Sequence, residues 1–328
     1  MRPASARRTF WVALVAAVLL AALGGLAVGP VRLTPIEVWD ALRGRGTVTA
    51  IAIMRDIRAP RVVLAALVGA ALAMSGAALQ GTMRNPLAEP YLLGVSGGAA
   101  VGAVIAVAGG APFGLVPLGA FAGAVAAVIL VLAIARAGGR RPDPRVLLMA
   151  GVVVGAFANA VIMIALASAP ADSARNALWW MMGSVAGATW VQVGWFTAYG
   201  VVSASALLVF APEIDVLALG DDAAASLGVN VDRAGRRAYV VASLLAAATV
   251  AAAGLVGFVG LVVPHLVRAR AGNRHRGVIA AAGLAGAALL VVADLAARTL
   301  RSPSELPLGA VTALAGVPFF LFQLRRYR

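Results

Sequence analysis

Long, nearly uncharged apolar runs are the feature that most constrains how this chain can fold. Three of them cover residues 10–28, 62–79 and 146–166, each near the roughly 20 residues that an α-helix needs to cross a bilayer. Of the 328 residues, 62% are hydrophobic and 12% are charged, whereas about a quarter of the residues in a soluble domain are charged. Too little polar surface remains to cover a globule. The sequence therefore predicts an all-α, polytopic membrane protein and excludes a soluble domain.

Apolar segments recur along the whole chain and predict about ten transmembrane helices in one domain, residues 1–328. The first run is interpreted as a retained helix, since no small-x-small cleavage site precedes Gly29. The predicted crossings lie near residues 10–28, 62–82, 91–108, 115–135, 146–168, 191–211, 237–257, 258–267, 278–297 and 307–324. The eighth is too short to span alone unless neighbouring helices bury it. The polar stretch 30–61 is expected to form an external loop.

The distribution of arginine predicts the topology. All 27 basic residues are arginine, and 18 of them fall in inner segments if both termini are cytoplasmic, in agreement with the positive-inside bias. The nine arginines of the outer segments are Arg32, Arg43, Arg45, Arg55, Arg58, Arg61, Arg175, Arg298 and Arg301. Six of these lie in the outer stretch 30–61, against the bias, so we expect them to have another role.

Lysine and cysteine are absent, which excludes several chemistries. A phosphate-binding loop of the Gly-x4-Gly-Lys-Ser/Thr type needs its lysine, so any nucleotide hydrolysis must come from another chain. A Schiff-base lysine, a thiol nucleophile and a disulfide framework are excluded on the same ground. The net charge of +14 is scattered over short loops between apolar runs. We therefore expect membrane lipid, and no nucleic acid, as a partner.

A weak internal repeat is visible in the positions of glycine and proline. Gly76 and Gly254 are each followed ten residues later by a proline, Pro86 and Pro264, and the common offset is 178 residues. Because the two helices are the second and the seventh predicted crossings, the two halves would run in opposite senses. Inverted repeats with matching helix breaks are typical of transporters.

Two polar segments stand between apolar runs on the predicted inner side. In residues 84–99, Pro86 and Pro90 prevent a continuous helix beside Asn85 and Glu89, although an ordinary tight turn would explain the prolines as well. Residues 213–230 combine acidic and apolar side chains and predict two short helices, broken at Gly220 and ended at Gly228. Such an element forms a docking surface for a soluble partner; a solvated loop is the alternative.

Few ionisable side chains lie within the apolar runs. Asp294 precedes Arg298 by four residues, which predicts a neutralised helical ion pair near the outer end, with a proton relay in a secondary transporter as the alternative. His265 follows a proline at a predicted helix break and is expected to bond a freed backbone carbonyl rather than a metal. His275 lies in a basic inner loop and cannot be placed near His265 from sequence, so no metal site is expected.

Seven motifs occur in an order that resembles one family. They are RAPR (58–61), SGAALQGTMRNPLAEPYLLGVSGGA (75–99), WWMMGS (179–184), LALGDDAAASLGV (217–229), GFVGLVVPHLVR (257–268), DLAAR (294–298) and ELPLGAVTALAGVPFF (305–320). Together they resemble the permease subunits of ATP-binding-cassette (ABC) importers for iron–siderophore, haem and vitamin B12, the FecCD-type, type II importer family. The resemblance covers essentially the whole chain.

The resemblance implies a set of partners. Such permeases pair as homodimers or close heterodimers, bind two ATPase subunits below and receive a periplasmic or lipid-anchored binding protein above. ATP and Mg²⁺ would be bound by the ATPase, so no cofactor is expected in this chain and the chain itself is not an enzyme. Its location would be the bacterial cytoplasmic (inner) membrane.

The resemblance also implies residue roles. Arginines expected to dock the binding protein are Arg58, Arg61 and Arg298. The expected cytoplasmic gate comprises Asn85, Leu87, Asp143 and Arg145. The residues expected to couple to the ATPase are Leu217, Leu219, Gly220, Asp221, Asp222, Leu227 and Gly228. The second gate element reads Pro-Asp-Pro-Arg at 142–145, where the family has small hydroxyl residues.

The resemblance leaves the cargo open. An iron chelate, siderophore or haem, is the expected substrate, and cobalamin is the alternative. A secondary transporter that uses Asp294 as its ion site is the alternative from a different class.

Overall fold

The computed structural model describes residues 4–31, 33–137 and 144–325, and within these ranges the chain is helical with no strand. Seven of the described helical runs are long and apolar enough to cross a membrane. The long helices are α1 (Ala4–Ala27), α4 (Ala59–Thr82), α6 (Val116–Ala137), α7 (Pro144–Ser168), α9 (Trp190–Leu217), α11 (Val231–Ala253) and α13 (His275–Thr299). Shorter helices at the remaining predicted crossings are α5 (Val95–Ala108), α12 (Val259–Ala271) and α14 (Leu308–Arg325). The all-α, polytopic prediction is confirmed, and these ten helices match the predicted crossings.

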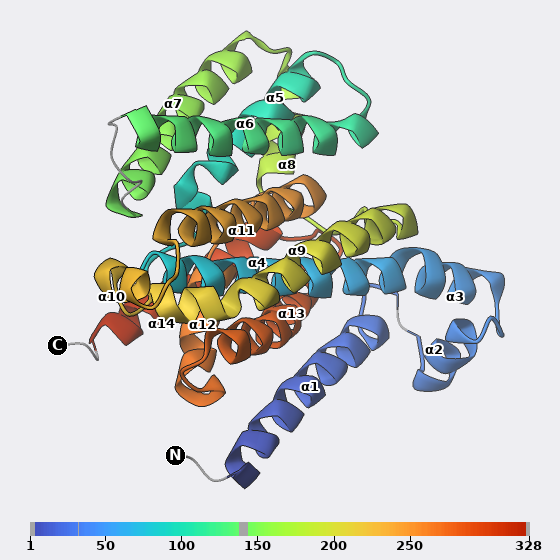
Figure 1. The fold of residues 1–328 in the computed structure, drawn as a ribbon. Helices are drawn as coiled ribbons and strands as arrows, with labels where there is room; N and C mark the ends of the chain where they lie inside the picture. The colour runs from blue at the N-terminus through green and yellow to red at the C-terminus, as the bar shows by residue number, and fades with distance from the viewer. Residues whose placement is uncertain (1–3, 32, 138–143, 326–328) are drawn as a thin grey trace.

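Helix α4 runs through the centre of the bundle (Figure 1). It packs against α9, α11, α12 and α13, and 78% of its most apolar stretch is buried, against 11% for α1 at the periphery. Glycine permits this packing: a Cβ on Gly76 would lie 1.9 Å from the carbonyl oxygen of Gly260 in α12. A Cβ on Gly69 would lie 2.2 Å from the carbonyl oxygen of Gly286 in α13. Close approach through small residues is a common way for helices to associate in lipid.

A second group of helices, α5, α6, α7 and α8 (Ala171–Met181), lies beside the first group, at the top of Figure 1. Helix α11 contacts α4 and α9 on one side and α5 and α6 on the other. It therefore joins the two groups through its largely buried surface.

The order of elements agrees with the predicted internal repeat. Long α4 is followed by short α5, of 14 residues, and long α11 by short α12, of 13 residues. Gly254 ends α11 with a φ of +68°, as a helix break there requires. Pro264, in contrast, lies inside α12 and does not end a helix. Helix α12 also extends to Ala271, beyond the expected 267.

The polar stretch 30–61 is mostly helical, not the open loop expected from its composition. It contains α2 (Pro35–Leu42), α3 (Val48–Ala52) and the π-helical turn η1 (Ile53–Arg58). Thr34 and Glu37 form a capping box at the start of α2, where Pro35 occupies the first helical position. The hydrogen bonds that Thr34 donates hold the pKa of the Glu37 carboxyl below its usual range.

The two ends of the bundle carry different elements. Helices α2 and α3 lie at one end, and the short helix α10 (Asp221–Ser226) lies at the other (Figure 1). In the same view, the start of α1 and the end of α14 both lie toward the α10 end. This arrangement agrees with an even number of crossings.

Candidate functional site

Helix α10 and the last turns of α9 form the segment expected to couple to a partner. Gly220 separates them with a φ of +111°, a backbone conformation that favours glycine. The inner side of this segment is held by Ala224, which is fully buried against Leu217 and Ala234. The sequence predicted two short helices, but the residues up to Leu217 belong to the long α9. Only the part after Gly220 is a separate short helix.

The outer side of this segment is exposed and amphipathic. Leu219 and Leu227 are 66% and 62% exposed, and Asp221 and Asp222 are exposed in the first turn of α10. Gly228, with a φ of +81°, ends the segment as the sequence predicted. Large apolar side chains exposed next to carboxylates at the tip of a helical projection are typical of an interaction surface.

An ion pair connects α10 to the segment that follows α4. The guanidinium of Arg84 donates to the Asp221 carboxylate at 2.8 Å, and both side chains are partly exposed. Arg84 itself has a φ of +50°, which is uncommon for a residue other than glycine. The turn continues through Asn85, whose side-chain oxygen accepts a hydrogen bond from the Leu87 N–H at 2.9 Å.

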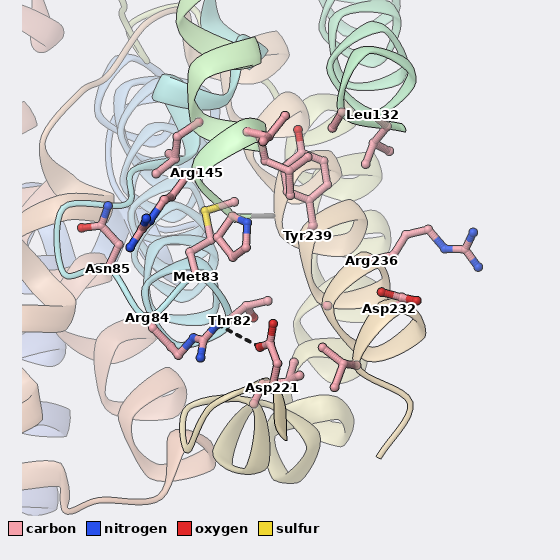
Figure 2. A pocket seen from close by; sticks show the side chains of 18 of the residues that line it. Thr82, Met83, Arg84, Asn85, Leu132, Arg145, Asp221, Asp232, Arg236 and Tyr239 are labelled. Carbon is pink, nitrogen blue, oxygen red and sulfur yellow. Dashed lines mark hydrogen bonds and ion pairs between the residues drawn. The ribbon is translucent and has the colours of Figure 1, made fainter. Parts of the chain in front are cut away.

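The residues expected to form the gate are partly brought together. Asn85 and Arg145 line the same cavity at the α10 end of the bundle (Figure 2). Leu87 is 45% exposed and does not line this cavity. Asp143 lies outside the described residues.

A partly buried histidine–aspartate contact was missed by sequence reasoning. The backbone N–H of His275 donates to an Asp215 carboxylate oxygen at 2.7 Å, and His275 Nδ1 lies at 2.7 Å from the same oxygen. The contact joins the end of α9 to the start of α13. No local signal could have found it, because the two residues are 60 positions apart.

The helix breaks of the two halves are also joined to each other. A carboxylate oxygen of Glu89 accepts a hydrogen bond from the Phe258 N–H at 2.8 Å, and the Tyr91 hydroxyl accepts one from the Val256 N–H at 3.1 Å. The Gln80 amide donates to two carbonyl oxygens of α12. Backbone groups freed by the break are thereby satisfied, as burial in a membrane protein requires.

The three arginines expected at an outer docking rim lie inside the protein. Arg58, Arg61 and Arg298 are each 3–5% exposed. Arg58 donates to the carbonyl oxygens of Leu26 and Ala27, at the end of α1, at 2.8 and 3.2 Å, and also to that of Val31. Arg298 donates to the Gly25 carbonyl oxygen. Two of the three therefore satisfy carbonyl groups at the end of α1, which a helix leaves without partners.

Arg61 is the centre of an ion-pair cluster. Its guanidinium contacts the Asp294 carboxylate at 2.8 Å and the Glu305 carboxylate at 2.7 Å. Arg298 lies 3.7 Å from Asp294, so the predicted helical pair is present but Arg61 is the closer partner. Because Asp294 is only 1% exposed and faces two guanidinium groups, it is poorly suited to act as a proton carrier.

No group of three His, Asp or Glu residues close enough to hold a metal ion occurs in the described ranges. His265 lies half-buried within α12.

Comparison with known proteins identifies the relatives of this chain. The FecCD transport family matches residues 9–326. The cobalamin import permease BtuC of Halobacterium salinarum is 45% identical over 84% of this chain and 74% of that protein. The hemin transport permease HmuU of Yersinia pestis is 40% identical over 83% of each chain. The Fe(3+) dicitrate permease FecD of Escherichia coli is 39% identical over 84% of this chain and 86% of that protein.

A solved structure has the same fold. It is described as an inward-facing conformation of a metal-chelate-type ABC transporter, and it is 26% identical to this chain. The two superpose with a TM-score of 0.87 over 97% of this chain and 99% of the other. Since both the family and the fold match over nearly the full length, this chain belongs to the FecCD transport family of membrane permeases.

Proposed function

We propose that this chain is the permease subunit of an ABC importer that moves a metal chelate, an iron–siderophore or haem, across the inner membrane. The observation that carries the proposal is the match of the FecCD transport family to residues 9–326. Cobalamin is the second candidate, because the cobalamin permease of Halobacterium salinarum is 45% identical to this chain.

ATP hydrolysis would be supplied by two separate ATPase subunits that bind ATP and Mg²⁺. The absence of lysine supports a separate ATPase subunit, since this chain cannot form a phosphate-binding loop of the Gly-x4-Gly-Lys-Ser/Thr type. The exposed Leu219 and Leu227 beside Asp221 and Asp222 support α10 as the contact for the ATPase. A second copy of the permease would complete the pathway, with α10 and both termini on the cytoplasmic side.

A binding protein would dock at the opposite end, near Arg58, Arg61 and Arg298. Glu305 is the partly exposed member of the Arg61 cluster, with 34% of its side chain accessible. An acidic side chain of the binding protein would therefore reach Arg61 by replacing Glu305. Such an exchange keeps the guanidinium paired throughout, which matters because an unpaired buried charge is costly.

The gate would open as α10 moves. The Arg84–Asp221 ion pair supports this mechanism, since it connects α10 to the turn that holds Asn85 and Leu87. The gate proposed here comprises Asn85, Leu87, Asp143 and Arg145. Movement of α10 by the ATPase would pull on this turn directly.

Reversing the charge of Arg84 tests this link. We expect Arg84→Glu to reduce ATP-driven uptake about threefold to tenfold while changing stability by under about 1 kcal/mol, because exposed ion pairs contribute little to folding. The double variant with Asp221→Arg should recover most of the uptake. Uptake and ATPase rates in proteoliposomes measure both effects.

The matched control is Arg175→Glu on α8, which breaks an exposed pair with Asp172 of the same 2.8 Å length. We expect this variant to transport normally. Unchanged uptake in Arg84→Glu, or equal loss in the control, would contradict the proposed link.

Reconstitution tests the function itself. The permease, its ATPase and its binding protein are placed in proteoliposomes and offered a ferric siderophore, haem or cobalamin. We expect uptake of one iron chelate that requires internal ATP and persists when a protonophore collapses the proton gradient. Uptake that occurs without the ATPase and follows the proton gradient would identify a secondary transporter instead.

A further inference from the structure

A large cavity opens at the α10 end of the bundle, between the ends of several helices (Figure 2). Its volume is about 1500 Å³. The walls come from α4, α6, α7, α9 and α11, and α10 contributes Asp221. Pockets for drug-sized ligands are about 300–1,000 Å³, so this cavity has room for a larger occupant.

The charge of the cavity is strongly positive. Its described lining includes five arginines, at 84, 136, 145, 233 and 236, and two aspartates, at 221 and 232. Arg84 is neutralised by Asp221. Within the described ranges, no carboxylate lies within ion-pairing distance of the side chains of Arg136, Arg233 or Arg236. These three side chains, exposed on α6 and α11, favour an anionic occupant.

The same cavity has an apolar wall beside the arginines. Leu132 and Ile134 of α6, Val146 and Leu148 of α7 and the buried Tyr239 of α11 line it. Ile134 and Val146 are 42% and 41% exposed. An inorganic anion would use the arginines and leave this wall uncovered, whereas an amphipathic molecule would cover both.

The arginines lie at the level where lipid headgroups are expected. Arg136 is in the last turn of α6, Arg145 is in the first turn of α7 and Arg233 is in the first turn of α11. All three helices are long enough to cross the membrane, so their ends meet the headgroup region. Basic pockets between transmembrane helices are a recurrent form of lipid recognition.

We propose that this cavity binds an anionic phospholipid. The phosphate lies among Arg136, Arg233 and Arg236, and an acyl chain lies along Ile134 and Val146. The lipid would contact both the Arg84 turn and α10, the two elements that the Arg84–Asp221 pair joins. The proposal rests on the membrane-spanning fold and does not depend on which substrate is transported.

The test uses the full-length protein, purified in detergent. Phosphatidylglycerol or phosphatidylcholine of the same acyl composition is added, and bound lipid is measured by native mass spectrometry alongside the thermal unfolding midpoint. The cavity variant carries Arg136→Gln, Arg233→Gln and Arg236→Gln. The control variant carries Arg270→Gln, Arg274→Gln and Arg276→Gln, three exposed arginines outside the cavity that remove the same charge.

We expect the wild type and the control variant to retain phosphatidylglycerol in preference to phosphatidylcholine and to unfold at a higher temperature with it. The cavity variant should lose about tenfold or more in phosphatidylglycerol affinity, because each arginine near an anionic headgroup contributes appreciably to binding. Size-exclusion chromatography verifies that the cavity variant is folded. We expect it to fold because the three substituted arginines are exposed.

Three results would overturn the proposal. Equal binding of the two lipids would mean that the arginines do not select a charged headgroup. Equal stabilisation by inorganic phosphate would assign the site to a free anion. Unchanged lipid binding in the cavity variant, combined with weakened binding of the ATPase, would assign the arginines to a protein contact.

Discussion

Replacing Arg61 by leucine is expected to destabilise the protein by about 3–5 kcal/mol, the usual cost of removing one partner from a buried ion pair. The substitution would leave the Asp294 carboxylate, which is 1% exposed, without its closest cation. Glu305 would lose the same partner, although its exposure lets water compensate. Arg298 lies 3.7 Å from Asp294 and already donates to the Gly25 carbonyl oxygen. It is therefore poorly placed to replace Arg61 as the partner of Asp294.

Thermal unfolding in detergent, followed by tryptophan fluorescence, measures this effect. Arg301→Leu is the matched control, since Arg301 is an exposed arginine near the same end of α13. Adding Asp294→Asn to Arg61→Leu should recover part of the lost stability, because it removes the stranded charge. A Tm of Arg61→Leu equal to that of the control would refute the structural role of the cluster.

Placing an alanine at Gly76 is the second change with a large expected effect. The new Cβ would lie 1.9 Å from the carbonyl oxygen of Gly260, and the next contacts are backbone atoms too. Backbone cannot rotate away as a side chain can, so α4 and α12 would have to separate. Overpacking a tight contact costs about 1–3 kcal/mol and occasionally more, and we expect the upper part of this range here.

The hydrogen bonds of Gln80 to the same stretch of α12 would be strained by that separation. The measurement is the yield of folded, monodisperse protein together with its Tm. Gly155→Ala on α7 is the control, because no atom lies within 4 Å of its added Cβ. Normal stability of Gly76→Ala would indicate that the two helices are not in the close contact described here.

The transmembrane segments could be predicted well because each is a local property of the chain. A run such as 146–168 carries its own apolar surface and satisfies its own backbone hydrogen bonds. The predictions from sequence were less accurate where the local structure depends on helix caps and on packing. The stretch 30–61 folds into α2 and α3 through caps at Thr34 and Thr47, which its polar composition concealed.

The surroundings of the residues expected to contact partners could be predicted only in part. The amphipathic segment around α10 was visible because Leu219, Asp221 and Leu227 lie within one short stretch. The burial of Arg58, Arg61 and Arg298 could not be predicted from the sequence. Arg61 and Asp294 are 233 residues apart, and only the packing of α4 against α13 brings them together.

By itself, the sequence determined that this protein lies in a membrane, how its crossings are spaced and that it lacks a phosphate-binding loop of the Gly-x4-Gly-Lys-Ser/Thr type. Those properties follow from hydropathy and from the absence of lysine, which need no knowledge of neighbours. The tertiary structure alone decided which charges are paired. It placed Arg61 between two carboxylates and left Arg136, Arg233 and Arg236 exposed at the wall of the cavity, because the partners of a charge are set by helix packing rather than by position along the chain.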